Sequence, residues 1–262
     1  MPFPEIDPIA FRLFGFAVYW YALAYIAGIL LGFRCMLSAN VHLGKPFSRN
    51  TIESFMNWAI IGIVIGGRLG HIVYEPEVFW QNPQHIFAIR QGGMSFHGGF
   101  LGVLSAAWVF SRKKGLCFWR FMDILAFATP IGLFLGRLAN FVNGELYGRP
   151  TTLPWGIVFP RAGPEVRHPS QLYEALFEGL VLWGVLWSAL CLRKTPLAVG
   201  RLAGIFAFGY GLIRIVLECV RAPDSLFNEV LFETLHVTLG QILSFPLVAI
   251  GLWLLCRKSP EK

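Results

Sequence analysis

Residues 136–148 of the chain, GRLANFVNGELYG, combine one arginine, two asparagines and one glutamate directly after an apolar run. On a helix, Arg137, Asn140 and Asn143 recur roughly every three to four residues, so their side chains share one face. If the apolar run crosses a membrane, polar side chains at its end are costly and tend to have a function. This face is therefore the first candidate for a functional site.

Two further arginines, Arg68 and Arg214, interrupt other apolar runs. An arginine in mid-bilayer costs about 2.5–3.5 kcal/mol on insertion scales and usually faces the interior of a helix bundle. Because the guanidinium fork matches phosphate and keeps its charge, a shared anion such as a lipid phosphate would explain all three arginines. The alternative is structural: ion pairs with Glu145, Glu174 or Glu218, or snorkelling to the membrane surface. Arg214 and Glu218 are four residues apart on a helix and could pair directly.

His97 is flanked by two glycine pairs, Gly92-Gly93 and Gly98-Gly99, at the start of another apolar run. Glycine lets the backbone bend and approach a ligand closely, and the start of a helix offers free N–H groups to an anion. This setting favours an acid–base role for His97. Two structural alternatives remain, namely a hydrogen-bonded histidine and glycines that serve close helix packing.

The apolar runs that carry these residues indicate an integral membrane protein. The 262 residues are 55% hydrophobic, 15% aromatic and only 14% charged, whereas about a quarter of the residues of a soluble domain are charged. The net charge of +7 does not point to a nucleic acid partner, because the cations occur in short clusters between apolar runs. The N-terminal residues lack the cationic region and cleavage site of a signal peptide, so the first run is expected to stay in the mature protein.

We expect an all-α membrane protein in which residues 1–262 form a single polytopic domain. An apolar run of about 20 residues is long enough to span a bilayer. The predicted spans are seven: residues 15–35, 54–74, 95–111, 121–141, 172–192, 202–220 and 237–256. Irregular loops are expected at residues 142–171, which are rich in proline and glycine, and at residues 221–236. These loops either line a site or serve as plain connections.

The distribution of cations predicts the orientation of the spans. Lys and Arg are concentrated in alternate connecting segments, and segments of this kind face the cytoplasm. The N-terminus is therefore expected outside and the C-terminus inside. In this arrangement the three arginines, His97, Tyr210 and Tyr21 all fall in the outer half of the membrane, whereas Asp123 falls near the inner end of its span.

The five cysteines give no sign of a metal site or a disulfide framework. Cys35, Cys117, Cys191 and Cys256 fall at predicted cytoplasmic ends, and only Cys219 falls near the outer face. Their spacing has no metal-ligand pattern, so they are interpreted as small apolar side chains.

The chain resembles the bacterial prolipoprotein diacylglyceryl transferases along essentially its whole length. Residues 136–148 look like the signature of that family. The further stretches that agree, in the same order, are residues 92–99 (GGMSFHGG), residues 168–174 (HPSQLYE), residues 209–211 (GYG) with Arg214, Glu218, Arg221, Pro223 and Asp224, and residues 240–244 (GQILS). One difference is Gln91, where members of the family commonly carry an acidic residue.

The resemblance implies a multi-pass enzyme of the bacterial cell inner membrane, with seven spans and an active site that faces the periplasmic leaflet. It would transfer the diacylglyceryl group of phosphatidylglycerol to the thiol of the lipobox cysteine in a prolipoprotein signal peptide. The products would be a thioether-linked lipoprotein and glycerol 1-phosphate, in the first step of lipoprotein maturation. No metal or organic cofactor is implied. The implied partners are the two substrates and the surrounding membrane lipids.

The resemblance also assigns roles to individual residues. Arg137 matches the phospholipid-binding arginine of the family, and residues tied to activity match His97, Asn140, Gly148, Tyr21, Tyr210, Arg214 and Glu145. A cysteine thiol, with a pKa of about 8.5, needs a base or nearby cations to become a nucleophile. His97 is the candidate base, and Tyr210 or a purely electrostatic route are the alternatives.

Arg137 and Arg214 would stabilise the negative charge that develops on the leaving phosphate. Asn140, Asn143 and Tyr21 would orient the lipid head group or a carboxylate, and Glu145 would hold an arginine in place. The remaining candidate substrate contacts are Arg68, Gly98, Gly99 and Gly148.

Two other classes of protein stay open, namely a transporter for an anionic lipid or solute and a binding protein without chemistry. The polar groups at the outer rim and the lack of an internal repeat count against a transporter.

Overall fold

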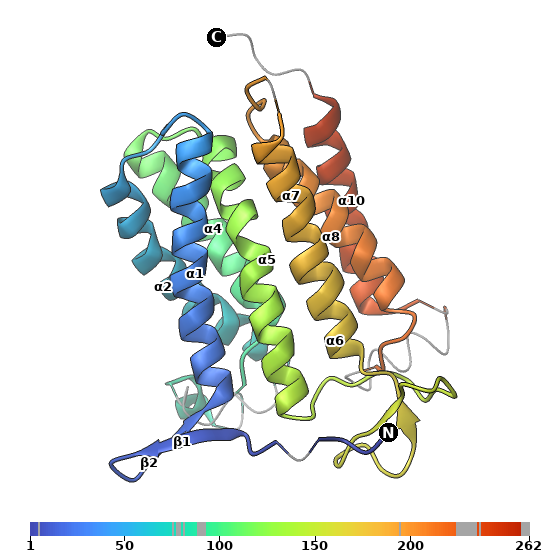
Figure 1. Cartoon of the computed structure of the whole chain (residues 1–262). Helices are drawn as coiled ribbons and strands as arrows, with labels where there is room; N and C mark the ends of the chain where they lie inside the picture. Colours follow the sequence, from blue (N-terminus) through green and yellow to red (C-terminus); the bar gives the residue numbers. More distant parts are fainter. Residues whose placement is uncertain are drawn as a thin grey trace. The chain divides into compact units, whose positions relative to one another are not determined.

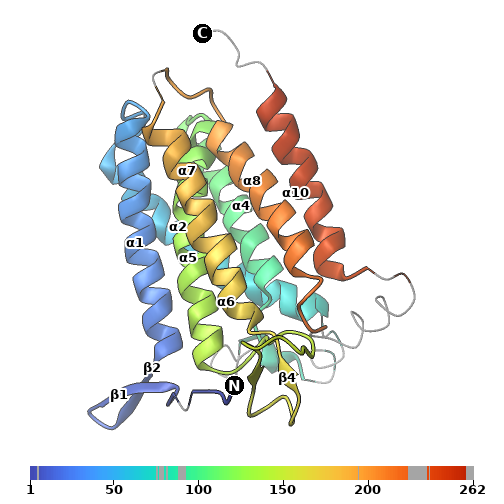
Figure 2. The same cartoon turned by 45° about the vertical axis from the view of Figure 1, so that its right-hand side comes forward.

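The computed structural model describes the whole chain except residues 5, 75, 77–79, 81, 88–92, 194, 224–234, 236 and 258–262. The chain divides into two compact units, residues 1–44 with 123–262 and residues 45–122, and each unit is described by itself. Figures 1 and 2 show the ribbon from two sides. The predicted all-α class is confirmed, because long helices dominate and the strands of the described residues form only two small antiparallel pairs.

The first unit contains most of the long helices. These are α1 (Trp20–His42), α5 (Phe118–Val142, whose first turn belongs to the second unit), α8 (Arg201–Leu217), α10 (Leu239–Cys256), and a continuous rod made of α6 (Ser170–Glu174), the π-helical segment η3 (Ala175–Val181) and α7 (Leu182–Cys191). In both views α5, the rod and α8 run side by side (Figures 1 and 2).

A hairpin precedes the first helix. β1 (Ile9–Leu13) pairs antiparallel with β2 (Phe16–Tyr19), and α1 follows directly. The expected span at residues 15–35 therefore began too early, because its first residues form a turn and a strand. Phe14 and Gly15 have positive φ angles of 48° and 84°, which reverse the chain, and the aromatic and β-branched residues after them favour a strand. A second pair, β3 (Ile157–Val158) and β4 (Val166–Arg167), lies in the loop after α5.

The second unit contains α2 (Arg49–Tyr74), the short helix η1 (Pro83–Phe87) and α4 (Phe96–Lys114). Helices α2 and α4 approach so closely that their glycines meet backbone to backbone. A Cβ added at Gly98 would overlap the carbonyl oxygen of Gly66 and lie 2.8 Å from Gly70 Cα, and a Cβ at Gly102 would lie 2.9 Å from the carbonyl carbon of Gly62. This arrangement is the small-residue packing that membrane helices use.

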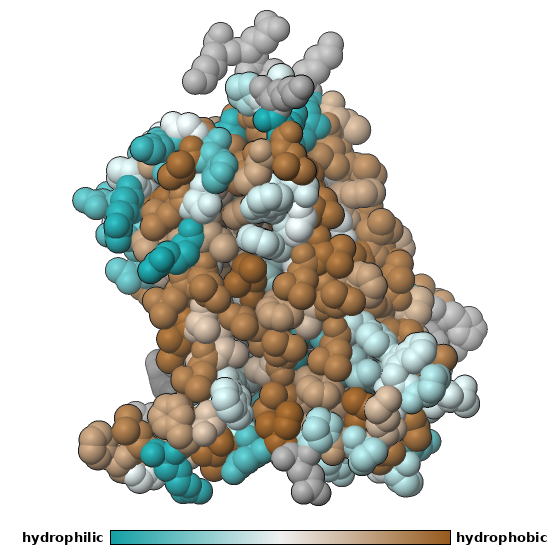
Figure 3. Space-filling view, viewed as in Figure 1, coloured by the Kyte–Doolittle hydropathy of each residue, from teal (hydrophilic) through white to brown (hydrophobic). Residues whose placement is uncertain are grey.

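Five of the described helices are long and apolar enough to cross a membrane. They are Trp20–His42, Arg49–Val73, Phe118–Val142, Ser170–Cys191 and Leu239–Cys256. The remaining two predicted spans, residues 95–111 and 202–220, coincide with α4, which has 19 residues and ends in three cations, and with α8, which has 17 residues. Large apolar side chains such as Ile26, Leu30 and Phe245 are exposed on the helices. Figure 3 shows hydrophobic residues over much of the face that is turned toward the viewer. Such a surface suits lipid rather than water.

Asp123, the polar residue that falls outside the predicted outer cluster, has a structural role. Its carboxylate is fully buried and accepts hydrogen bonds from the backbone N–H groups of Gly200, at 2.8 Å, and of Ala203, at 3.1 Å. These N–H groups lie at the beginning of α8, where the positive end of the helix dipole favours a carboxylate. Asp123 on α5 thus caps the helix that carries Tyr210 and Arg214.

Candidate active site

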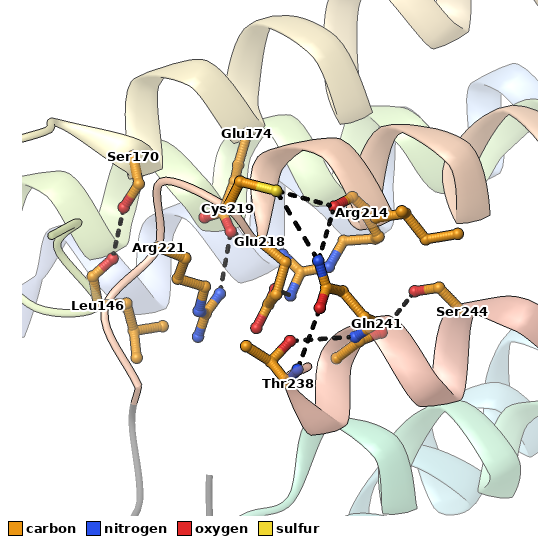
Figure 4. Close-up of polar contacts among 12 residues, drawn as sticks. Leu146, Ser170, Glu174, Arg214, Glu218, Cys219, Arg221, Thr238, Gln241 and Ser244 are labelled. Atoms are coloured by element: carbon orange, nitrogen blue, oxygen red, sulfur yellow. Dashed lines mark hydrogen bonds and ion pairs between the residues drawn. The ribbon is translucent and has the colours of Figure 1, made fainter. Parts of the chain in front are cut away.

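The helices of the first unit enclose a cluster of three arginines and three glutamates. Arg137 comes from α5, Glu174 from α6, Glu178 from η3 and Arg214 from α8, and Glu218 and Arg221 follow α8. Figure 4 shows Glu174, Arg214, Glu218 and Arg221 from these elements. All three carboxylates are buried, and the formal charges of the six side chains cancel. We call these six residues the charge cluster.

Each arginine of the charge cluster is paired with glutamate. Arg137 lies 3.3 Å from Glu174 through Nη1 and 3.3 Å from Glu178 through Nη2. Arg214 Nη1 lies 2.7 Å from Glu174 and 3.2 Å from Glu178, and its Nη2 lies 2.5 Å from Glu218. Arg221 Nη1 lies 2.9 Å from Glu174. The predicted pairing of Arg214 with Glu218 is thus confirmed, and ion pairing, the structural alternative for the arginines, is present.

Arg137 and Arg214, the two members of the charge cluster that the sequence singled out, keep a small accessible surface, whereas Glu174 and Glu178 do not. The side chains of Arg137 and Arg214 are 12% and 11% exposed, and those of Glu174 and Glu178 are 1% and 0% exposed. Since removing one partner of a buried ion pair costs about 3–5 kcal/mol, the cluster holds both guanidiniums firmly. An approaching anion would therefore meet arginine edges before it meets a carboxylate.

The glutamates stand on an irregular part of their rod. Glu174 ends α6, and Glu178 lies within η3, whose π-helical turns carry more residues than α-helical turns. Segments of this kind are rare and often occur at functional sites, because they re-aim the side chains of a helix. Here the segment brings both carboxylates, four residues apart, to the same two arginines.

The polar face at residues 136–148 forms a hydrogen-bonded turn at the end of α5. Glu145 Oε1 accepts from the side-chain amide of Asn140, at 2.9 Å, and from that of Asn143, at 3.2 Å. Gln171 on α6 donates to the carbonyl oxygen of Glu145, at 2.7 Å, and Ser170 donates to that of Leu146, at 3.1 Å. Among the described residues the Glu145 carboxylate accepts from these two asparagines and forms no ion pair with an arginine, so Glu145 organises the turn and does not hold an arginine in place.

Gly148 lies where three segments of the chain cross. Its N–H donates to the carbonyl oxygen of His168, at 2.9 Å, and Gly148 also forms a β-bridge with Arg221. A Cβ added at Gly148 would lie 2.6 Å from both His168 Cβ and the carbonyl oxygen of Val220. No other residue fits, and the glycine thereby ties the segment that carries Arg221 to the end of the signature.

The two candidate tyrosines differ in burial. Tyr210 lies on α8 one turn before Arg214, is buried, and stacks on Phe206 with ring centroids 5.6 Å apart. Tyr21 is in the first turn of α1, is exposed, and its hydroxyl lies 3.1 Å from that of Tyr25.

The remaining candidates belong to the second unit. Arg68 is buried and donates to the carbonyl oxygens of Ile86 and Gly93, both at 3.0 Å, and to that of His85. It therefore anchors the segment before α4, a role that the sequence did not suggest.

His97 is exposed at the second position of α4, after Ser95, whose hydroxyl caps the helix by accepting from Gly98 N–H at 3.2 Å. Gly98 makes the tight packing with α2, whereas Gly99 is in ordinary contact with Ile63. Gly92, Asp224 and Gln91, the position at which the chain differs from the family pattern, lie outside the described residues.

Sequence reasoning missed Glu178 as a partner of the arginines. The signal was present, because two carboxylates four residues apart in an apolar run need cationic partners. The sequence reasoning also assigned no role to Gly240. A Cβ at Gly240, on α10, would lie 2.7 Å from the carboxyl carbon of Glu218, so this glycine leaves the space in which Glu218 pairs with Arg214.

The fold and the site together define an integral membrane protein with a helical bundle that encloses paired arginines next to a rigid polar turn. The family model described as prolipoprotein diacylglyceryl transferase matches residues 8–257. The chain therefore belongs to the prolipoprotein diacylglyceryl transferase family.

Individual relatives agree with this assignment. The chain is 46% identical over 264 residues to the phosphatidylglycerol–prolipoprotein diacylglyceryl transferase of Rhizobium leguminosarum bv. trifolii, with 98% of this chain and 93% of the relative covered. It is 45% identical over 262 residues to the protein of the same name from Rickettsia felis, with both chains covered completely. A relative from Azospirillum brasilense with the same name is 46% identical over 259 residues, or 97% of this chain and 95% of the relative.

Proposed function

We propose that this protein transfers the diacylglyceryl group of phosphatidylglycerol to the lipobox cysteine of prolipoproteins, the first step of lipoprotein maturation. The cysteine sulfur forms a bond to the terminal glyceryl carbon, and the bond between that carbon and the phosphate oxygen breaks. The thiol proton passes to a base and then to water, and glycerol 1-phosphate leaves. Full-length similarity to relatives with that activity in their name supports the proposal.

The observation in the structure that carries the proposal is a pair of partly exposed arginine side chains, each ion-paired with fully buried glutamates. The side chains of Arg137 and Arg214 are 12% and 11% exposed, whereas those of Glu174 and Glu178, with which they pair, are 1% and 0% exposed. The remaining N–H groups of the two arginines would bind the phosphate of the lipid and stabilise the charge that develops on it when the carbon–oxygen bond breaks. The neutral cluster fixes both guanidiniums before substrate arrives, which reduces the reorganisation that catalysis requires.

The other candidates support this centre. Asn140, Asn143 and Glu145 form the rigid turn beside it, Gly148 fixes the following segment, and Tyr21 would contact the head group. His97 is proposed as the base that accepts the thiol proton, with Tyr210 or electrostatic activation by the arginines as alternatives. Arg68, Gly98 and Gly99 are proposed to shape the substrate contact around His97.

The membrane arrangement is part of the proposal. The protein would cross the bacterial inner membrane seven times as a single polytopic domain, with the N-terminus in the periplasm and the C-terminus in the cytoplasm. This orientation would bring the candidate site residues to the periplasmic leaflet. The cations Arg112–Lys114, at the end of α4, and Arg257, after α10, support a cytoplasmic location for these two helix ends. Phosphatidylglycerol, a prolipoprotein signal peptide and membrane lipids are the proposed partners.

The test is a reconstituted transfer reaction. The purified protein is incubated with labelled phosphatidylglycerol and a lipobox peptide, and the peptide thioether and released glycerol phosphate are quantified. Formation of both supports the proposal. Uptake of the lipid or its head group into vesicles without a thioether would indicate a transporter, and lipid binding alone would indicate a binding protein; either result overturns the proposed activity.

A further inference from the structure

One face of the β1–β2 hairpin consists of apolar side chains, most of which are exposed. Leu13 pairs with Phe16 and Phe11 pairs with Val18, and because residues on a strand alternate between faces, these four side chains share one face. Phe11, Leu13 and Phe16 are 48%, 53% and 78% exposed. Arg12, also exposed, pairs with Ala17 on the opposite face.

The turn of this hairpin carries a phenylalanine where the backbone favours other residues. Phe14 and Gly15 form the two-residue connection and both have positive φ angles, 48° and 84°. Turns of this form prefer Asn-Gly, because the first residue must adopt a left-handed conformation that asparagine tolerates and phenylalanine does not. Phe14 is nevertheless 93% exposed, so contacts within the chain do not offset its backbone strain. Strain of this kind at an exposed residue points to a partner outside the chain.

The position of the hairpin identifies that partner as a lipid bilayer. Tyr19, the last residue of β2, is also the N-cap of α1, and Trp20 N–H donates to the carbonyl oxygen of Pro8, at 3.0 Å. Helix α1 is long and apolar enough to cross a membrane. Figure 1 shows the hairpin extending sideways from the foot of this helix. When α1 crosses the bilayer, the hairpin therefore lies along the bilayer surface.

The chemistry of the hairpin suits this depth. Aromatic side chains favour the boundary between head groups and acyl chains, and apolar side chains backed by a cationic face are typical of interfacial anchors. Phe11, Leu13, Phe14 and Phe16 would enter the boundary, while Arg12 on the opposite face remains among phosphates and water.

We propose that the β1–β2 hairpin is an interfacial anchor that inserts the side chains of Phe11, Leu13, Phe14 and Phe16 into the leaflet at which α1 begins. The anchor fixes the depth and orientation of the N-terminal end of α1. This property is independent of the transfer reaction, and its test does not require activity.

The first test measures depth. A genetically encoded fluorescent amino acid is placed at position 14, or at position 12 as a matched control on the opposite face, in the full chain in nanodiscs of phosphatidylethanolamine and phosphatidylglycerol. Nitroxide lipids labelled at a shallow acyl carbon are expected to quench position 14 at least about twofold more than position 12. Equal quenching at the two positions, or quenching by aqueous iodide at position 14, would overturn the proposal. So would quenching that appears only at high protein-to-lipid ratios, because that result indicates a second copy of the chain.

The second test separates anchoring from turn stability. Phe14→Asn introduces the residue that the turn prefers and removes the apolar tip. Local turn stability alone predicts slower hydrogen exchange of residues 9–19, whereas loss of the anchor predicts faster exchange in nanodiscs. We expect faster exchange, with the exchange of α5 and α8 unchanged as the control for folding. Exchange that is unchanged or slower contradicts the anchor.

Discussion

Buried ion pairs join the helices of the first unit, residues 1–44 with 123–262, and α8 and α10 of that unit also approach closely at Gly251, whereas in the second unit, residues 45–122, α2 and α4 pack backbone to backbone at several glycines. The charge cluster joins α5, the rod and α8 through ion pairs of 2.5–3.3 Å. In the second unit α2 and α4 meet at Gly62, Gly66, Gly98 and Gly102. The buried Arg68 there binds backbone carbonyl oxygens rather than carboxylates.

The difference predicts which substitutions each unit tolerates. A change of charge in the charge cluster of the first unit leaves a buried partner unpaired. A single added methyl group between α2 and α4 forces two backbones apart, whereas many changes of surface charge on those helices are neutral. Changes of charge should therefore have their largest effects in the first unit, and in the second unit the largest effects should come from changes of volume between α2 and α4.

The largest effect is expected from Arg137→Ala. Loss of a donor that stabilises the developing charge should lower kcat about 100- to 1,000-fold, and Arg137→Lys should also lose most activity because an ammonium group does not reproduce the guanidinium fork. Reconstituted transfer assays and membrane-fraction levels give the readouts. Arg49→Ala, which removes an exposed arginine paired with Glu53 at 2.7 Å, is the matched control and should keep full activity. Full lipidation by membrane-inserted Arg137→Ala would refute the phosphate role.

Gly98→Ala should have the next largest effect, on stability. Its Cβ would lie 2.8 Å from Gly70 Cα and overlap the Gly66 carbonyl oxygen, whereas a Cβ at Gly99 meets Ile63 at an ordinary 3.6 Å. Overpacking of this kind typically costs about 1–3 kcal/mol. Thermal unfolding in detergent should therefore occur at a lower temperature for Gly98→Ala and be nearly unchanged for Gly99→Ala. A stable but inactive Gly99→Ala variant would instead indicate that Gly99 touches the substrate.

Gly240→Ala should have a moderate effect through Glu218. The new Cβ would lie 2.7 Å from the carboxyl carbon of Glu218, and a displaced Glu218 would shift Arg214, with a kcat about tenfold lower. Gly184→Ala is the control, because a Cβ there meets nothing within 4 Å. In a Glu218→Ala background, Gly240→Ala should cause no further loss. Additive losses would show that Gly240 acts in another way.

The sequence predicted much of this arrangement where the information is local. The pairing of Arg214 with Glu218 follows from a separation of four residues on one helix, and apolar runs predicted the helices. An uncharged run does not distinguish a strand from a helix, so the hairpin at residues 9–19 was missed. The partners of Arg137 lie 37 and 41 positions away along the chain, and no local pattern ranks Glu174 and Glu178 above Glu145. The close approach of Gly98 likewise depends on which helix faces it.

The smallest effect is expected from His168, which titrates in the loop of the first unit. Partial burial lowers the pKa of this imidazole in the folded protein, while its backbone bonds to Gly148 and Arg149. Since the unfolded chain keeps a histidine pKa of about 6.5, the unfolded state binds more protons once the pH falls below that value, and the folded state loses stability there but not at neutral pH. The unfolding temperature of the wild type should therefore fall more between pH 7.5 and about pH 5.5 than that of His168→Gln. An identical fall in both proteins would mean that protonation of this histidine does not disturb the crossing at Gly148, and the pH sensitivity of the first unit would then come from its buried carboxylates.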